Sequence, residues 1–287
     1  MKKPKLLFLS AMGIFGTIGI FVKYIPLNSA LIAFCRGVMG VAFLAFVTLL
    51  TRKCPDKAAI KKNLPILFLS GAAIGFNWIL LFESYNHTTV ATATVCYYFA
   101  PLFLLLASPL LGERLTLRKL LCVGIALVGL ILVSGVTEGS LPNMQEIEGI
   151  LFGVGAALLY ATVMLLNKKL SPIPAYDKTI LQLGSAALVL LPYLLITNRF
   201  VCPALSGIQW LLLCLVGILH TGIAYTMYFG AMKDLPAKTI AIFSYLDPVI
   251  AVVLSAVLLH ETITPWGVVG TVLILGSALY SELPEKK

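Results

Sequence analysis

Four ionisable side chains interrupt long apolar stretches of this sequence: Arg36, Glu83, His220 and Asp247. Placing an unpaired charge in apolar surroundings costs a few kcal/mol or more, so such a group normally faces a partner or a polar cavity. These side chains could therefore bind a polar or charged small molecule, or take up and release protons. We treat them as the first candidates for binding residues.

Two tyrosines, Tyr98 and Tyr245, each stand three residues before a proline, Pro101 and Pro248. Proline has no amide hydrogen and frees the carbonyl four residues earlier, here those of Tyr97 and Ser244, so we expect kinks that could act as hinges. A tyrosine combines an apolar ring with a polar tip, which suits an amphipathic solute. Further candidates for the same wall are Asn77, Trp78, Tyr97 and Tyr225.

The depth of each ionisable residue in its apolar segment suggests its partners. Arg36 lies about 10 Å from one end of its segment, and Glu83 lies near the same end of the next one. These depths predict an ion pair, which would either fasten two helices or contact a solute. His220 and Asp247 lie near the middle of their segments, where carrier proteins bind solutes. The alternatives are that His220 binds a neighbouring carbonyl and that Asp247 caps a helix break.

The composition excludes a soluble globular protein. Of the 287 residues, 60% are hydrophobic and only 11% are charged, and the mean hydropathy is +0.99. Soluble domains are about 25% charged, so this chain could not cover its surface with polar groups. The six cysteines form no CxxC pair and have no ligand-spaced histidine, which predicts neither a zinc site nor a disulfide framework. We expect an all-α polytopic membrane protein with lipid as its main solvent.

Apolar runs bounded by charges, prolines or glycines predict ten transmembrane helices. Ten spans leave connections too short for an added catalytic or nucleic-acid-binding domain, so the function must reside within the bundle. The predicted spans are residues 5–23, 29–50, 64–84, 89–111, 118–136, 148–167, 178–197, 208–230, 237–259 and 265–281.

Basic residues alternate between connections. All but Lys23, Arg36 and Arg199 of the 21 basic residues lie at the termini or in the even-numbered connections. The positive-inside rule therefore places both termini in the cytoplasm, and the connection that contains Glu138 and Glu146 outside. This distribution explains the formal net charge of +9 without a nucleic-acid partner.

The chain also repeats itself. The segment VATATVCYYFAP (90–101) aligns without a gap to AKTIAIFSYLDP (237–248), which superposes Tyr98 on Tyr245. The sequence thus divides into repeats 1–137 and 148–287 of five helices each, and an odd number of crossings forces the repeats into opposite orientations. Glu113 and Glu261 occupy equivalent connections, and we expect them to hold these connections in place.

Several motifs in a fixed order indicate a family. The first span reads GIFGTIGIFVKY, Arg36 stands in CRG, and each half repeats a helix, a proline, an apolar run, Glu-x-x-Thr and a glycine-rich helix. In these features the whole chain resembles the drug/metabolite transporter superfamily, specifically ten-helix members with two EamA-like domains. The resemblance implies a carrier of small organic solutes with a central cavity between the repeats. Two departures make the halves chemically unequal, because Glu83 aligns with Gly230 and Asp247 with Ala100.

The leading functional hypothesis is a secondary transporter in the cytoplasmic membrane. Its solute would be an amino acid or a related amphipathic metabolite, moved by alternating access, and export is implied by the family resemblance. No GxxxxGK[ST] motif indicates an ATP-driven step, so ion or solute gradients must supply the energy. The chain would act as a monomer or homodimer, without a cofactor.

The sequence leaves three alternative functions to consider. Asp247, His220 and Glu83 are consistent with a proton-coupled multidrug or organic cation carrier. An intramembrane enzyme would need a motif such as HExxH or GxSxG, and the sequence has neither. A channel would need a filter loop or a charged ring, which is not recognisable here.

Overall fold

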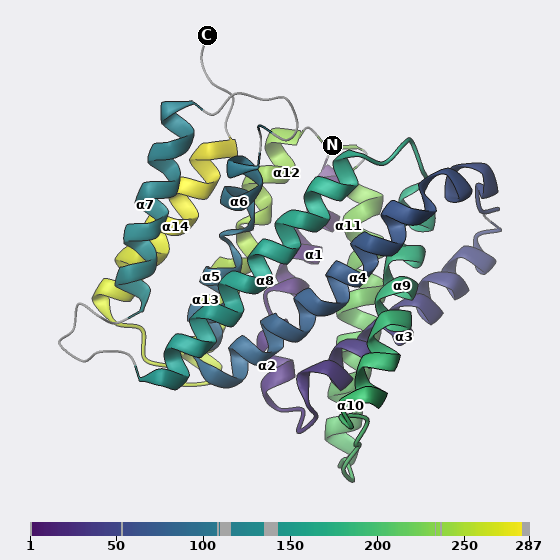
Figure 1. The fold of residues 1–287 in the computed structure, drawn as a ribbon, viewed down its shortest axis with the longest axis horizontal. Helices are drawn as coiled ribbons and strands as arrows, with labels where there is room; N and C mark the ends of the chain where they lie inside the picture. Colours follow the sequence, from purple (N-terminus) through teal and green to yellow (C-terminus); the bar gives the residue numbers. More distant parts are fainter. Residues whose placement is uncertain are drawn as a thin grey trace.

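The computed structural model describes residues 2–52, 54–107, 109, 116–134, 143–232, 234–235 and 237–282, and Figure 1 shows that their regular elements are helices. Six stretches are long and apolar enough to cross a membrane, and three shorter apolar helices accompany them. The described part of the chain is thus all-helical, as predicted, and its long apolar helices are consistent with a polytopic membrane protein. The six long stretches are Lys3–Lys23, Ser29–Leu50, Lys57–His87, Met144–Lys168, Ala175–Ile196 and Gly207–Tyr228.

The helices of the first half follow the predicted apolar runs, with interruptions inside two of them. The elements are α1 (Lys2–Phe15), α2 (Ile18–Lys23), α3 (Ser29–Leu50), α4 (Lys57–His87), α5 (Val90–Tyr97), α6 (Ala100–Leu106) and α7 (Leu117–Val133).

The second half has the same character and adds a π-helix, η3. Its elements are α8 (Met144–Lys168), α9 (Ala175–Ile196), α10 (Gly207–Cys214), η3 (Leu215–Ile223), α11 (Ala224–Met232), α12 (Ala237–Ser244), α13 (Leu246–Leu258) and α14 (Pro265–Glu282).

Polar residues at the ends of the apolar runs fix where helices begin. Asn28 and Thr89 accept hydrogen bonds from amides in the first turns of α3 and α5. Asn143 and Ser206 form complete capping boxes for α8 and α10. Such caps satisfy amides that have no partner within the helix, so each apolar run starts at a defined residue.

The predicted proline kinks are helix breaks. Helix α5 ends at Tyr97 and α6 begins at Ala100, while α12 ends at Ser244 and α13 begins at Leu246. The breaks fall at equivalent positions of the sequence repeat, directly before Pro101 and Pro248. Neither proline needs an amide hydrogen bond in the first turn of the new helix, which explains why each helix restarts there.

The helices pack in pairs that correspond between the two halves. Helix α4 packs on α8 and α9, and the corresponding contacts of the other half join α11 to α1 and η3 to α3. Helices α7 and α14 pack against each other, as do α5 and α13. At the α7–α14 crossing Gly129 meets Gly270, where an added Cβ on Gly129 would lie 2.7 Å from the Gly270 carbonyl oxygen.

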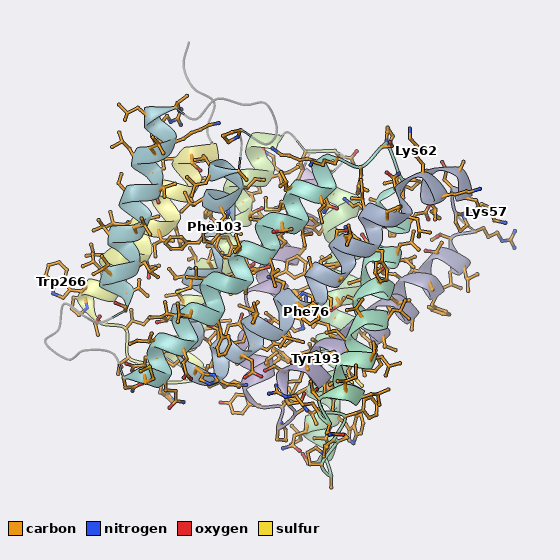
Figure 2. All side chains as sticks on the ribbon, viewed as in Figure 1. Lys57, Lys62, Phe76, Phe103, Tyr193 and Trp266 are labelled. Carbon is orange, nitrogen blue, oxygen red and sulfur yellow. The ribbon has the colours of Figure 1, made fainter. Side chains whose placement is uncertain are left out.

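The ends of the helices gather at two opposite edges of the bundle. In Figure 1 the start of α1 and the end of α14 lie at the upper edge, and the end of α3 and the start of α4 lie at the right-hand side, whereas the α2–α3 and α9–α10 connections lie at the lower edge. Figure 2 shows Lys57 and Lys62 at the upper end of α4, and Trp266 pointing away from the bundle at the lower start of α14. Trp266 is half exposed, as in the aromatic belts at membrane interfaces.

Candidate solute-binding site

Arg36 joins three helices in the interior of the bundle. Its side chain is only 5% exposed, and its Nε donates a hydrogen bond of 2.7 Å to Oγ1 of Thr221 in η3. The guanidinium lies 4.2 Å from the centroid of the Trp78 ring in α4. A cation over an indole face is attracted to the ring electrons, so Trp78 and Thr221 together fix the plane of the guanidinium.

The π-helix positions Thr221. Its hydroxyl donates to the carbonyl of Val216, five residues earlier, at 3.1 Å, so its oxygen remains available to accept from Arg36. Gly217 makes the approach of η3 to α3 possible, because an added Cβ would lie 2.5 Å from the Met39 side chain. π-Helical turns are rare and frequently occur at functional sites.

Asp247 and Tyr98 meet across the two helix breaks. The Tyr98 hydroxyl lies 3.0 Å from Oδ2 of Asp247 and 3.1 Å from the carbonyl oxygen of Ser244. This Ser244 carbonyl is the one that Pro248 was expected to free. The rings of Tyr98 and Tyr245, which align in the sequence repeat, lie 5.7 Å apart.

A row of tyrosine rings continues from Tyr98, the residue that contacts Asp247. The Tyr97 ring stacks on Tyr160 at 5.3 Å and contacts Tyr98 edge-on at 6.3 Å. Tyr98, which contacts Asp247, therefore belongs to one cluster of tyrosine rings with Tyr97 and Tyr160.

Asn77 holds Tyr97 in place within this row of tyrosines. Its Nδ2 donates to the Ala156 carbonyl in α8 at 2.5 Å, and its Oδ1 lies 3.4 Å from the Tyr97 hydroxyl. Tyr225 packs edge-on against Phe15 of α1 at 5.5 Å. The side chains of Tyr97, Tyr98, Tyr225 and Asp247 are only partly buried, although they belong to the interior cluster, so they retain surface that a small solute could touch.

The predicted ion pair between Arg36 and Glu83 is wrong. Glu83 Oε1 instead lies 3.7 Å from Nη1 of Arg199, which follows α9, while Arg36 binds Thr221 and Trp78. Two residues at the same depth meet only if their helices turn the right faces toward each other. The rotation of α3 and α4 about their axes is set by their packing with α9 and η3. Glu83 therefore lies outside the cluster that contains Arg36.

His220 follows the structural alternative. Its side chain is fully enclosed; Nδ1 lies 3.1 Å from the Leu215 carbonyl oxygen, and Nε2 lies 2.8 Å from Oγ1 of Thr17. In this conformation His220 offers no exposed surface to a solute. Its position beside Thr221 makes it a support of the π-helical turn.

Sequence reasoning missed Thr221, Tyr85 and Tyr160. None of the three carries a charge at neutral pH, and none has a like residue at the equivalent position of the sequence repeat. The one available signal was the pair His220-Thr221, because two adjacent polar residues in the middle of an apolar span are uncommon. The arrangement of Tyr160 on Tyr97 depends on how α8 faces α5, which no local pattern encodes.

Glu261 serves the structural role expected of it. Its Oε1 accepts the amide of Val90 at 3.0 Å, and Oε2 lies 3.4 Å from the amide nitrogen of Ala91. Glu261 also lines a surface cleft of about 280 Å³ together with Lys23, His87, Thr88, Thr89, Asn143, Gln145 and Glu146. Glu113, its counterpart in the repeat, lies outside the described residues.

Comparisons with known proteins identify the family to which this chain is similar. The model of the EamA-like transporter family matches residues 2–135 and 147–281. The chain is 33% identical over 248 residues to the uncharacterized transporter YxxF of Bacillus subtilis, covering 86% of this chain and 79% of that protein. It is 28% identical to an uncharacterized transporter of Archaeoglobus fulgidus, covering 92% and 90%.

A crystal structure of another protein has the same fold. It superposes with a TM-score of 0.67 at 21% sequence identity and covers 98% of this chain and 97% of that one. The family model spans both halves of the bundle, including α3 with Arg36 and α13 with Asp247. The chain therefore belongs to the EamA-like transporter family of the drug/metabolite transporter superfamily.

Proposed function

We propose that this protein is a secondary transporter that exports a small organic metabolite, such as an amino acid or a related amphipathic compound, by alternating access. The observation that carries the proposal is the contact of Tyr98 from the first half with Asp247 from the second half at 3.0 Å, within a row of tyrosine rings that includes Tyr97 and Tyr160. Charges inside a membrane bundle are expensive, and transporters place them at the solute site between the two halves.

The proposed architecture is ten spans in two inverted five-helix repeats. Its support is the correspondence of the packing: α4–α8 corresponds to α11–α1, and α4–α9 to η3–α3. Some residues also contact their own equivalent in the other repeat, as Tyr98 contacts Tyr245. A two-fold relation between the halves produces this pattern, because equivalent residues then meet only at the axis.

Contacts at the end of the bundle that contains Glu261 support one closed state of an alternating-access cycle. Ser84 of α4 donates to the carbonyl of Gly149 in α8 at 2.6 Å, and Lys23 at the end of α2 donates to the carbonyl of Tyr85 in α4 at 2.5 Å. These contacts join α2, α4 and α8. We propose that this end faces outward and that both termini lie in the cytoplasm, in agreement with the distribution of basic residues.

A proton-coupled carrier of organic cations is the second candidate. It is favoured by the Asp247 carboxylate, which Tyr98 contacts at 3.0 Å, because a carboxylate with aromatic neighbours can bind either a proton or an organic cation. The two candidates differ in what Arg36 does. A cation carrier would gain nothing from a buried guanidinium at its solute site.

Counterflow in proteoliposomes tests the proposal. Vesicles that contain the purified protein are loaded with unlabelled amino acids, polyamines or tetraethylammonium, and the entry of the same labelled solute is followed. Faster entry into vesicles loaded with an amino acid is expected, because alternating access exchanges solutes. Acceleration by tetraethylammonium alone would favour the cation carrier. Entry that no internal solute accelerates would overturn alternating access and indicate a channel.

A further inference from the structure

The first span is broken where it meets the second half of the protein. Gly16 and Thr17 separate α1 from α2, and the amide of Thr17 donates to the carbonyl of Ile14, three residues earlier, at 3.1 Å. Gly16 lies against the start of α13, because an added Cβ would lie 2.7 Å from the carbonyl oxygen of Asp247. The break in the first span is therefore packed directly against the second repeat.

His220 of η3 also contacts this break. Its Nε2 lies 2.8 Å from Oγ1 of Thr17, and its ring packs edge-on against Phe21 of α2 at a centroid distance of 4.9 Å. The next residue, Thr221, accepts the hydrogen bond from Nε of Arg36. A short path of contacts therefore leads from the break in the first span through the π-helix to Arg36.

The hydrogen atoms of the contact between Thr17 and His220 can be assigned from its neighbours. The carbonyl oxygen of Leu215 can only accept, so Nδ1 of His220, 3.1 Å away, carries the hydrogen. In a neutral imidazole Nε2 is then the acceptor, and the hydroxyl of Thr17 donates to it. The same hydroxyl lies 2.7 Å from the carbonyl oxygen of Ile14. Thr17 thus keeps a hydrogen-bond acceptor in its own helix when the contact with His220 opens, which makes the contact reversible.

The equivalent interface between the two repeats is built differently. Helices α4 and α8 correspond to the span with η3 and to the broken first span, and both run without interruption beside each other (Figure 1). Hydrogen bonds from α4 side chains to carbonyl groups of α8 hold this pair at two levels, at 2.5 and 2.6 Å. The sequence repeat places Met164 opposite Thr17 and Ala73 opposite His220. The contact between Thr17 and His220 therefore belongs to one interface and has no counterpart in the other.

We infer that Thr17 and His220 are positioning residues of the transport cycle, whose hydrogen bond makes the break in the first span and the π-helix that holds Arg36 move together. Hinges are a few residues at the ends of elements that absorb a change in backbone conformation, and both segments are irregular in this way. Because lipid offers no water to replace a lost partner, a hydrogen bond between them is an effective link. The inference goes beyond the proposed function but rests on it, since such a link matters only in a protein that changes conformation.

Hydrogen–deuterium exchange of the protein in nanodiscs tests the coupling without any solute. Thr17→Val replaces the hydroxyl with a methyl group of similar size. We expect the amides of η3, in the other repeat, to exchange roughly threefold to tenfold faster, because a lost hydrogen bond changes the opening equilibrium by about this factor. Thr17→Ser retains the hydroxyl and should exchange like the wild type. Equal exchange of η3 in Thr17→Val and wild type overturns the coupling.

Thr162→Val is the matched control for the loss of a threonine hydroxyl. The Thr162 hydroxyl donates to the carbonyl of Leu158 within α8 at 3.0 Å, and α8 corresponds to the first span in the other repeat. This variant should leave the exchange of η3 unchanged. Faster exchange of η3 in Thr162→Val as well would mean that η3 responds to any loosening of the bundle, which also overturns the coupling.

Two substitutions of His220 separate its contact with Thr17 from its support of η3. The longer side chain of glutamine can place its amide near the position of Nε2 and contact Thr17, whereas that of asparagine reaches the position of Nδ1 and contacts Leu215. We expect His220→Asn to speed the exchange of residues 16–21, and His220→Gln to leave it close to wild type. The reverse order would show that His220 acts only within η3 and would overturn the inference.

Counterflow separates this inference from the proposed function. With amino acids, polyamines and tetraethylammonium as the probes, Thr17→Val should lower the maximal rate of labelled entry roughly threefold to tenfold, and Thr17→Ser should restore it. An equal maximal rate in Thr17→Val and wild type overturns the positioning role and leaves the transporter proposal standing. If η3 responds to Thr17→Val but none of these probes drives counterflow, the coupling of the two segments stands and alternating access is overturned.

Discussion

Glu261 caps a helix of the other half of the protein: its Oε1 accepts the amide of Val90, the first residue of α5, at 3.0 Å. The carboxylate comes from the connection between α13 and α14, so one hydrogen bond ties the end of the second repeat to the start of a broken helix in the first. Negative charge at a helix N-terminus is favourable because the unpaired amides and the helix dipole both attract it. The contact therefore holds the start of α5 against the connection between α13 and α14.

Removing this cap should loosen the first turn of α5. In Glu261→Ala, we expect the amides of Val90 and Ala91 to exchange hydrogen roughly tenfold to a hundredfold faster, because a charge-assisted hydrogen bond contributes about 1.5–3 kcal/mol. Hydrogen–deuterium exchange with mass spectrometry provides the measurement. Glu146→Ala is the control, since Glu146 caps its own helix α8 and should affect only that helix. Equal exchange of α5 in Glu261→Ala and wild type would show that the cap contributes nothing.

The orientation of the chain can be tested with its own cysteines. Cys54 follows α3 and Cys202 follows α9, and both are exposed, whereas the other four lie within helices. A membrane-impermeant maleimide should label Cys202 in intact cells and should reach Cys54 only after permeabilisation, because the connection with Cys54 is basic. The variants Cys54→Ser and Cys202→Ser identify the two signals. Labelling in the opposite order would reverse the proposed topology.

Two glycines of α7 should respond differently to a methyl group. Gly129 meets Gly270 and Ile274 of α14, where an added Cβ would lie 2.7 and 2.8 Å from its neighbours. Gly129→Ala should lower the free energy of unfolding by about 1–3 kcal/mol through overpacking. Gly124 has nothing within 4 Å of an added Cβ, so Gly124→Ala should be neutral or slightly stabilising. Thermal unfolding in one detergent compares them, and equal shifts would contradict the close crossing.

A double-mutant cycle tests the partner of Glu83. Arg199 and Glu83 lie 3.7 Å apart with side chains 48% and 19% exposed, and we expect a coupling of about 0.2–1 kcal/mol that decreases with added salt. The cycle of Arg36→Gln with Glu83→Gln should be additive within about 0.5 kcal/mol. Unfolding midpoints of the single and double variants supply both values. Strong coupling of Arg36 to Glu83 would contradict the separation seen in the structure.

The sequence alone was sufficient to predict that this protein is surrounded by lipid and where most of its helical segments lie. The hydropathy and the low charge of the chain require lipid, and a chain in lipid must satisfy its backbone hydrogen bonds within each span, which makes helices the available solution. Local signals were sufficient for the ends and breaks as well. Asn143 with Glu146 marks the start of α8, and Pro101 and Pro248 mark the breaks, because caps and prolines act on their own backbone.

The tertiary structure decided which side chains meet. Arg36 was recognised from its type, but its contacts with Thr221 and Trp78 depend on how α3, α4 and η3 are rotated about their axes, and depth along a helix says nothing about rotation. The π-helical turn that presents Thr221 arises where Gly217 packs against Met39. Tyr160 joins the site because α8 packs beside α5. Such contacts join residues far apart in the chain, and their energies depend on all the packed surfaces together.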